Sequence, residues 1–104
     1  MSARLVILGG AGLLGTVLAA QARADGRDVA SLTSADCDVT DSAASGRHIR
    51  AGDVVINCAA YTRVDDAERD RARAHAVNAT GAGNVARACA EAGAGLLHVR
   101  AYIT

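Results

Sequence analysis

The chain has 104 residues, enough for one small domain. Its 11 basic and 11 acidic residues cancel, which argues against a nucleic-acid-binding surface and a polybasic membrane patch. No apolar run reaches the roughly 20 residues of a membrane span and no signal-peptide pattern opens the chain, so we expect a cytoplasmic protein. Apolar residues make up 51% and aromatic residues 2%, which predicts a core of Ala, Val, Leu and Ile.

Short apolar runs typical of buried parallel strands alternate with segments of helical spacing. The expected strands are 4–8, 29–32, 53–58 and 95–99, with a short extended piece at 37–39. The expected helices run from Leu13 to Asp25-Gly26, from Thr40-Asp41-Ser42 to about Ala51, and twice within 64–92, where the longer ends at Gly93. This alternation predicts an α/β fold with right-handed βαβ units, a doubly wound parallel sheet and the strand order 3-2-1-4-5.

Cysteine and histidine spacing predicts neither a disulfide framework nor a metal site. The cysteines are odd in number and lack a Cys-x-x-Cys pattern, so we expect buried or half-buried free thiols at Cys37, Cys58 and Cys89. The histidines do not cluster as zinc ligands do, and we expect structural roles for His48, His75 and His98.

A glycine-rich turn joins the first expected strand to the first expected helix, with glycines at 9, 12 and 15. In dinucleotide-binding turns the first glycine allows a sharp turn, the second lets a diphosphate approach the backbone, and the third lets the helix pack on the sheet. Amide groups at the helix start would bind the phosphates. Gly9, Gly12 and Gly15 therefore predict the binding of NAD or NADP, and the alternative is a glycine-rich turn without a ligand.

The end of the second expected strand bears on the choice between these cofactors. A carboxylate there normally binds the adenosine ribose, but this chain has Thr33 and Ser34. With no carboxylate to repel a 2′-phosphate, NADP is tolerated and somewhat favoured; with no arginine to grip it, the choice stays open. After the 53–58 strand, the small residues of 57–62 suit close approach of a cofactor, or serve only helix–sheet packing.

The Gly-x-x-Gly-x-x-Gly spacing resembles that of the extended short-chain dehydrogenase/reductase family. In that family an acidic residue followed by an aliphatic one meets the adenine, which implies this role for Asp38 and Val39. The alternative is that Asp38 is only a turn residue. Asn78 is expected either to steady a neighbouring strand end or to be an exposed helix residue.

Within that family the sequence is similar to the dTDP-4-dehydrorhamnose reductases, through stretches at 53–62, 64–65, 67–68, 76–81, 91–94 and 96–99. The resemblance implies reduction of the 4-keto group of dTDP-4-dehydro-L-rhamnose to dTDP-L-rhamnose by NADPH or NADH. It also implies that the diphosphate contacts Gly12, Leu13 and Leu14. It implies that the middle of the cofactor contacts Ala60, Tyr61 and Thr62. The dTDP-sugar would approach Val64 and Asp65.

The chain departs from this family at its last five residues, 100–104. The catalytic hydroxyl residue of the family aligns with Ala101, and the sequence contains no Tyr-x-x-x-Lys. A positioned proton donor contributes on the order of 10²–10⁴-fold, so we assign no catalytic residue and expect negligible reductase activity. We expect residues 1–104 to be the N-terminal part of a dinucleotide-binding domain, from a truncated or frame-disrupted gene. The expected fold is then a partial NAD(P)-binding Rossmann fold, without its C-terminal strands or a substrate domain.

Two other functions stay open. One is a sugar-nucleotide epimerase or dehydratase of the same extended family, and the other is a non-catalytic NADP-binding regulatory protein. Some reductases of this kind are magnesium-linked dimers with a glutamate early in the first helix. Here that region is Thr16-Val17, so we expect no metal, while a homodimer remains open.

Overall fold

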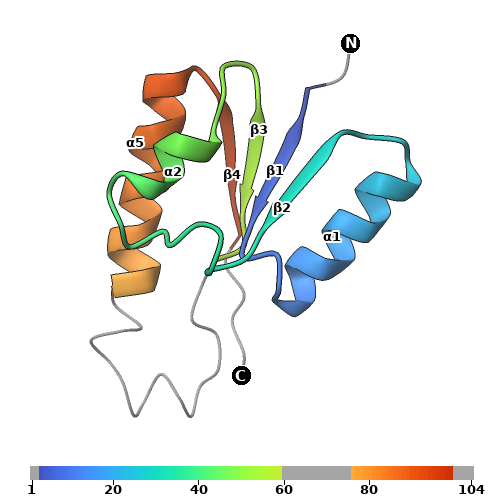
Figure 1. Cartoon of the computed structure of the whole chain (residues 1–104), viewed down its shortest axis with the longest axis horizontal. Coiled ribbons are helices and arrows are strands. Elements are labelled where there is room, and N and C mark those ends of the chain that lie inside the picture. The colour runs from blue at the N-terminus through green and yellow to red at the C-terminus, as the bar shows by residue number, and fades with distance from the viewer. Residues whose placement is uncertain (1–2, 60–75, 100–104) are drawn as a thin grey trace.

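The computed structural model describes residues 3–59 and 76–99. Its strands are β1 (Leu5–Leu8), β2 (Val29–Leu32), β3 (Val54–Asn57) and β4 (Gly95–His98). Its α-helices are α1 (Leu13–Ala24), α2 (Ala44–His48) and α5 (Ala82–Ala92), and a π-helical stretch, η1 (Ala76–Gly81), leads directly into α5. Helix α1 lies on one face of the sheet, and α2 and α5 lie on the other (Figure 1). The predicted α/β class is confirmed.

The four described strands form one parallel sheet in the order β2-β1-β3-β4. Leu5 pairs with Val29 on one side and with Val54 on the other, and Val54 pairs with Gly95. The central position of β1 explains its unbroken apolar run, because all four of its residues are buried. The expected order holds for these strands.

The extended piece predicted at 37–39 does not join the sheet. Thr33–Asp36 and Asp38–Asp41 instead close two turns, in which Asp36 N–H and Asp41 N–H donate to the Thr33 and Asp38 carbonyl oxygens. Cys37 and Val39 between them point into the core. Burial of the Cys37 and Val39 side chains and the two turns around them hold this segment in place, so it does not pair with β2 as a strand.

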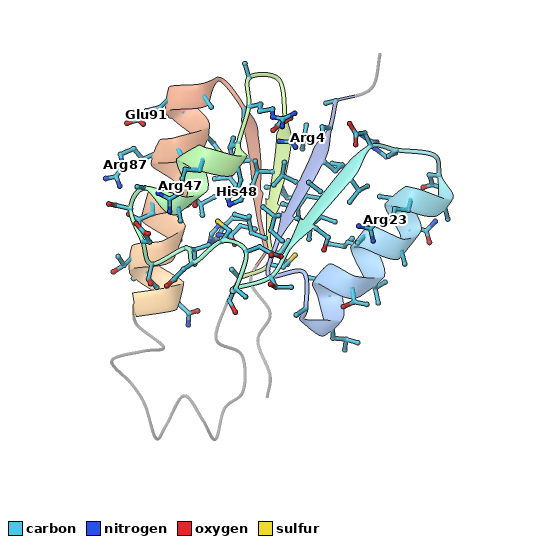
Figure 2. All side chains as sticks on the ribbon, in the orientation of Figure 1. Arg4, Arg23, Arg47, His48, Arg87 and Glu91 are labelled. Atoms are coloured by element: carbon cyan, nitrogen blue, oxygen red, sulfur yellow. The ribbon has the colours of Figure 1, made fainter. Side chains whose placement is uncertain are left out.

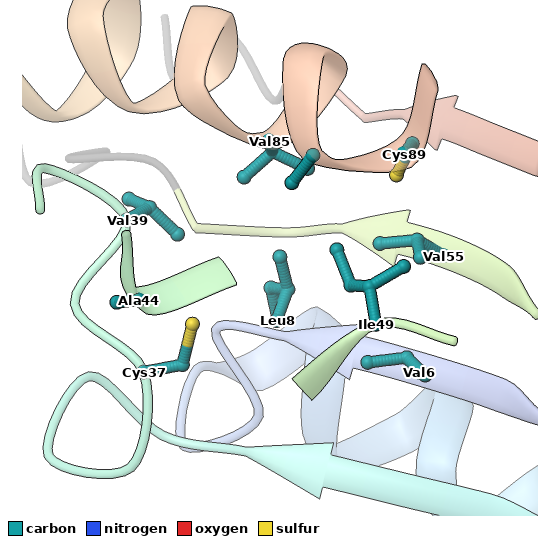
Figure 3. Close-up of a cluster of buried hydrophobic side chains, with 10 residues drawn as sticks. Val6, Leu8, Cys37, Val39, Ala44, Ile49, Val55, Val85 and Cys89 are labelled. Atoms are coloured by element: carbon teal, nitrogen blue, oxygen red, sulfur yellow. The ribbon is translucent and has the colours of Figure 1, made fainter. Parts of the chain in front are cut away.

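The main core lies between the sheet and the α2–α5 layer (Figure 3). It consists of small aliphatic side chains and two thiols: Val6, Leu8, Cys37, Val39, Ala44, Ile49, Val55, Val85, Ala88 and Cys89. Because side chains alternate along a strand, Leu5 and Ile7 point instead to the α1 side. The predicted aliphatic core is confirmed. Cys37 and Cys89 are buried, Cys58 is half-buried, and burial raises the pKa of each of these free thiols.

The ends of the helices follow the predicted glycines more closely than the predicted caps. Helix α1 ends at Ala24, before Gly26 with φ 78°, and α5 ends before Gly93 with φ 78°. Helix α2 was expected from 40–42 but begins at Ala44, with Ala43 as its N-cap. The Asp41 carboxylate accepts the Ala43 N–H at 3.0 Å instead, so this side chain closes a turn ahead of the helix.

A partly buried ion pair joins Arg4, just before β1, to Asp53, just before β3. The Arg4 Nη2 and Nε atoms donate to the two carboxylate oxygens of Asp53 at 2.7 and 3.2 Å, and Nη2 also donates to the His48 carbonyl oxygen. Arg50 N–H donates to the same carboxylate at 2.8 Å. The hydrogen bond from Arg4 lowers the pKa of Asp53. Arg4 lies at the amino ends of the strands (Figure 2), so this pair stabilises the fold at the end of the sheet opposite the glycine turn.

Candidate functional site

The carboxyl ends of β1, β2 and β3 meet around the glycine turn. Gly9 has φ 75°, and a Cβ there would lie 2.7 Å from the Ala59 nitrogen and the Cys58 carbonyl carbon. Gly15 is buried, and a Cβ there would overlap the Gly9 carbonyl oxygen and lie 3.0 Å from Gly10 Cα. Both glycines are therefore required by the chain's own packing, as predicted for the first and third of the turn.

Gly12 differs from these two glycines. Its φ of −72° and ψ of 167° suit any residue. A Cβ at this position would meet only the Gly9 carbonyl oxygen, at 3.4 Å, the close end of ordinary contact. Gly12 is also exposed. The fold does not need a glycine here, so the space above Gly12 is available to a closely approaching ligand.

The beginning of α1 presents its backbone amides at this space. Gly12 is the N-cap and makes no side-chain cap bond, and the first N–H groups of a helix have no acceptor within it. Leu13 and Leu14 follow with exposed side chains, Leu13 at 86%. Thr16 Oγ1 donates to the Gly12 carbonyl oxygen at 2.8 Å, and this hydrogen bond holds the turn against the first turn of α1. Such a helix start favours a bound anion.

A carboxylate lies at the end of β2, although the sequence analysis placed none there. Asp36 Oδ2 accepts the Thr33 N–H at 3.0 Å and the Thr33 hydroxyl at 3.1 Å, and Asp36 N–H reaches Thr33 Oγ1 at 3.4 Å. The Thr33 N–H bond is the main reason that the pKa of Asp36 is lowered. This reciprocal pairing is the arrangement of a Thr-x-x-acid capping box, a signal already present in the sequence.

Asp38 and Val39, the residues assigned to the adenine, have different environments. Asp38 is exposed, and its Oδ1 accepts the Thr40 N–H at 3.0 Å and the Thr40 hydroxyl at 2.6 Å. Val39 is buried in the core, and a Cβ at Gly81 would lie 2.6 Å from its Cγ2. Of the pair, Asp38 alone has an exposed side chain, and it also performs the turn role given as the alternative.

Asn57 fixes the carboxyl end of β3, at the same end of the sheet as the glycine turn. Its buried side chain accepts the Ala59 N–H at 2.9 Å through Oδ1, and its Nδ2 lies 3.4 Å from His98 Nδ1 at the end of β4. Because Ala59 contacts Gly9, the Asn57 side chain holds the backbone next to the glycine turn and links the ends of β3 and β4.

Asn84 performs a similar task for the Asp38–Val39 segment, and the sequence analysis missed it. Asn84 is buried, and its Nδ2 donates to the Val39 carbonyl oxygen at 2.9 Å. Asn78, the asparagine singled out from the sequence, is exposed. Helical periodicity places Asn84 on a face of α5 but does not show the contact with a loop far away in the chain.

Replacing Asn84 by alanine is expected to lower the free energy of unfolding by about 1.5 kcal/mol, because the Val39 carbonyl loses a buried donor. Urea unfolding followed by circular dichroism measures this. Arg87, whose Nη2 donates to Asn84 Oδ1 at 3.1 Å, lies on the outer side of α5 (Figure 2). Arg87→Ala should change the same quantity by less than about 0.5 kcal/mol. Equal effects of the two substitutions would contradict this role.

The family model described as the RmlD substrate binding domain matches residues 3–103. The chain belongs to the RmlD substrate-binding domain family. Its relatives include dTDP-4-dehydrorhamnose reductases of Mycolicibacterium smegmatis, 58% identical over 95% of this chain and 30% of the relative, and of Mycobacterium tuberculosis H37Rv, 61% identical over 94% and 32%. The chain thus spans about a third of the length of these RmlD-family relatives.

Solved structures share the same fold. A dTDP-4-dehydrorhamnose reductase from Bacillus anthracis in complex with NADP superposes with a TM-score of 0.82 and 36% identity, over 92% of this chain and 35% of that one. A UDP-glucose 4-epimerase from Thermus thermophilus in complex with NAD superposes with a TM-score of 0.77 at 24% identity, over 86% and 34%. The second likeness shows the fold alone. The Rossmann-like architecture predicted for the chain is confirmed.

Part of the predicted RmlD-family site lies outside the described residues. This applies to Ala60, Tyr61, Thr62, Val64 and Asp65. Within 3–59 and 76–99, no group of three or more His, Cys, Asp or Glu side chains could hold a metal ion. No helix in the same ranges is long and apolar enough to cross a membrane.

Proposed function

We propose that this chain binds the diphosphate of NADPH or NADH over Gly12, at the beginning of α1. In this proposal residues 1–104 are the N-terminal part of the dinucleotide-binding domain of a dTDP-4-dehydrorhamnose reductase. The main support for this proposal is that the three glycines of the turn differ in how closely the protein packs around them. Packing explains Gly9 and Gly15, whereas the surroundings of Gly12 leave room for a side chain. A glycine at that position is explained if a bound diphosphate occupies the space that a side chain would fill.

Each predicted contact has a distinct task in this proposal. The N–H groups of Leu13, Leu14 and Gly15 donate to the phosphates, and the dipole of α1 adds to this attraction. The exposed carboxylate of Asp38 lies in the loop beyond β2, on the adenosine side. Ala60, Tyr61 and Thr62 remain predicted contacts of the middle of the cofactor, and the dTDP-sugar contacts remain predicted at Val64 and Asp65. The bound nicotinamide would supply hydride to a keto carbon.

The proposed reaction is the reduction of dTDP-4-dehydro-L-rhamnose to dTDP-L-rhamnose. The names of the relatives at 58% and 61% identity support this substrate. The 104 residues contain no Tyr-x-x-x-Lys, so we assign to them the binding of the cofactor and not the protonation of the keto oxygen. The proposal keeps the expectation of a cytoplasmic protein and leaves a homodimer open.

Substitution of Gly12 tests the proposal. Gly12→Ala is expected to raise the dissociation constant for NADH about tenfold, a loss of about 1.4 kcal/mol, and Gly12→Val to abolish measurable binding. Both variants should stay folded and lose no more than about 1 kcal/mol of unfolding free energy, the typical cost of alanine or valine at an N-cap. Isothermal titration calorimetry and urea unfolding measure the two quantities.

Gly83→Ala is the matched control, because a Cβ at Gly83 in α5 has nothing within 4 Å. This variant should bind NADH as the unsubstituted chain does. If neither NADH nor NADPH binds the unsubstituted chain, the proposed function is wrong. If Gly12→Val binds NADH normally, the diphosphate does not lie over Gly12.

The missing Tyr-x-x-x-Lys also suits a non-catalytic NADP-binding regulatory protein. Titration of the NADH-loaded chain with dTDP tests the sugar-nucleotide contacts predicted at Val64 and Asp65. Saturable dTDP binding supports the reductase, because a regulatory protein has no need of a nucleotide-sugar site.

A further inference from the structure

We infer that Asp36 makes this chain select NADH over NADPH. The inference rests on the proposed cofactor binding and concerns the adenosine end of the same site. Thr33 and Ser34 offered neither a carboxylate nor an arginine, so the sequence favoured NADP somewhat and left the choice open. In the structure the chain turns back after Ser34, and the Asp36 carboxylate accepts hydrogen bonds from Thr33.

The position of Asp36 relative to the glycine turn follows from hydrogen bonds that link both of them to the end of β2. Gly10 N–H donates to the Leu32 carbonyl oxygen at 2.9 Å, so the turn and the end of β2 lie against each other. Thr33 is the next residue, and its N–H and hydroxyl hold Asp36 Oδ2 at 3.0 and 3.1 Å. In doubly wound folds the adenosine ribose lies at this strand end, where a carboxylate accepts its 2′-hydroxyl.

The hydrogen bonds of Asp36 favour that role. Both Thr33 donors engage Oδ2, and a carboxylate has a second oxygen that accepts in other directions. The reciprocal bond from Asp36 N–H to Thr33 Oγ1 at 3.4 Å closes the turn. The carboxylate is thus held in place before any ligand binds, and it can accept the 2′-hydroxyl of NADH at little further cost in side-chain entropy.

The charges of the neighbouring loop oppose a 2′-phosphate. Asp38 and Asp41 follow Asp36 in the same segment and add to its negative charge. Among the described residues, the neighbouring Arg47 and His48 side chains already have hydrogen-bond partners. Arg47 Nη2 lies 3.5 Å from Asp41 Oδ2, and His48 Nε2 lies 3.0 Å from the Asp36 carbonyl oxygen. The 2′-phosphate of NADPH would therefore meet carboxylates in the place where NADP-binding sites provide arginine.

Equilibrium binding of NADH and NADPH to the full 104-residue chain, measured by isothermal titration calorimetry, tests this inference. The unsubstituted chain should bind NADH about tenfold more tightly than NADPH, and Asp36→Asn should reduce that ratio by about fivefold or more, the scale of unit charges a few ångström apart in water. Asp28→Asn is the matched control. It removes the same charge from an exposed residue at the opposite end of β2 and should leave the ratio unchanged.

A second measurement needs no variant. Raising the salt concentration from about 0.01 M to 1 M shortens the screening length from about 30 Å to 3 Å, so the preference of the unsubstituted chain for NADH should narrow.

Equal or tighter binding of NADPH overturns the inference, as does an unchanged ratio in Asp36→Asn or an equal shift in Asp28→Asn. The inference is also wrong if the ratio of NADPH to NADH dissociation constants stays the same at high salt. Failure of both cofactors to bind refutes the proposed function itself, which separates the two failures.

Discussion

Replacing Gly15 by alanine is expected to lower the free energy of unfolding by about 3 kcal/mol, the upper end for overpacking a well-packed site. The added Cβ would overlap the Gly9 carbonyl oxygen and press on Gly10 Cα. Both obstacles are main-chain atoms, and Gly9 is itself held by φ 75° and by its contacts with Cys58 and Ala59. No flexible side chain can move aside, so α1 must shift away from the sheet.

Urea unfolding followed by circular dichroism measures this loss, since the chain has no tryptophan. Gly12→Ala and Gly83→Ala are the controls, because an added Cβ meets only the Gly9 carbonyl oxygen at 3.4 Å in the first and nothing within 4 Å in the second. The test is whether Gly15→Ala lowers the free energy of unfolding more than either control does. If Gly12→Ala destabilises the fold as much as Gly15→Ala, the division of roles within the glycine turn is wrong.

Replacing Asp53 by asparagine is expected to lower the free energy of unfolding by about 2 kcal/mol at neutral pH, between the effects for exposed and for fully buried pairs. The substitution leaves the Arg4 guanidinium, whose side chain is only 18% exposed, beside a neutral amide. It also weakens the acceptor for the Arg50 N–H. Asp41→Asn is the control, because the exposed pair of Asp41 with Arg47 at 3.5 Å should contribute less than about 1 kcal/mol.

The pH dependence of the Asp53 effect has a definite sign. The hydrogen bond from Arg4 lowers the pKa of Asp53 in the folded state, whereas an aspartate in the unfolded chain has a pKa of about 3.9. The pair therefore stabilises the fold fully above the unfolded pKa and loses this contribution as the pH falls through the folded pKa. The difference in unfolding free energy between the unsubstituted chain and Asp53→Asn should be constant from about pH 5 upward and shrink below about pH 4. A difference independent of pH would show that packing, not charge, causes the loss.

Local signals in the sequence predicted the fold well. The strands at β1, β2, β3 and β4 follow from short apolar runs, and the ends of α1 and α5 follow from Gly26 and Gly93. These features depend on neighbouring residues and on the period of a helix or strand. The roles of Gly9 and Gly15 were predictable for the same reason, since the turn lies between a strand and a helix.

The features missed at the candidate site depend on side chains that bond to distant or folded-back backbone. The Thr33-x-x-Asp36 pairing closes a turn just before the 37–39 segment that was expected to be extended, and its pattern is that of a capping box placed where no regular helix begins. The hydrogen bond from Asn84 to Val39 joins two segments that only the tertiary fold brings together. No periodicity in the sequence reports such a contact.

The parallel sheet has a consequence for how this chain folds. Every strand pair in it joins segments separated by a crossover: Leu5 with Val29, Leu5 with Val54, and Val54 with Gly95. The described strands form no hairpin, so no pairing can begin locally. Strand β1 precedes both of its neighbours in the chain, so it stays without the second of them until β3 has been made. Folding is therefore expected to be slower than for a helical bundle of this length, because loop closure must precede each pairing.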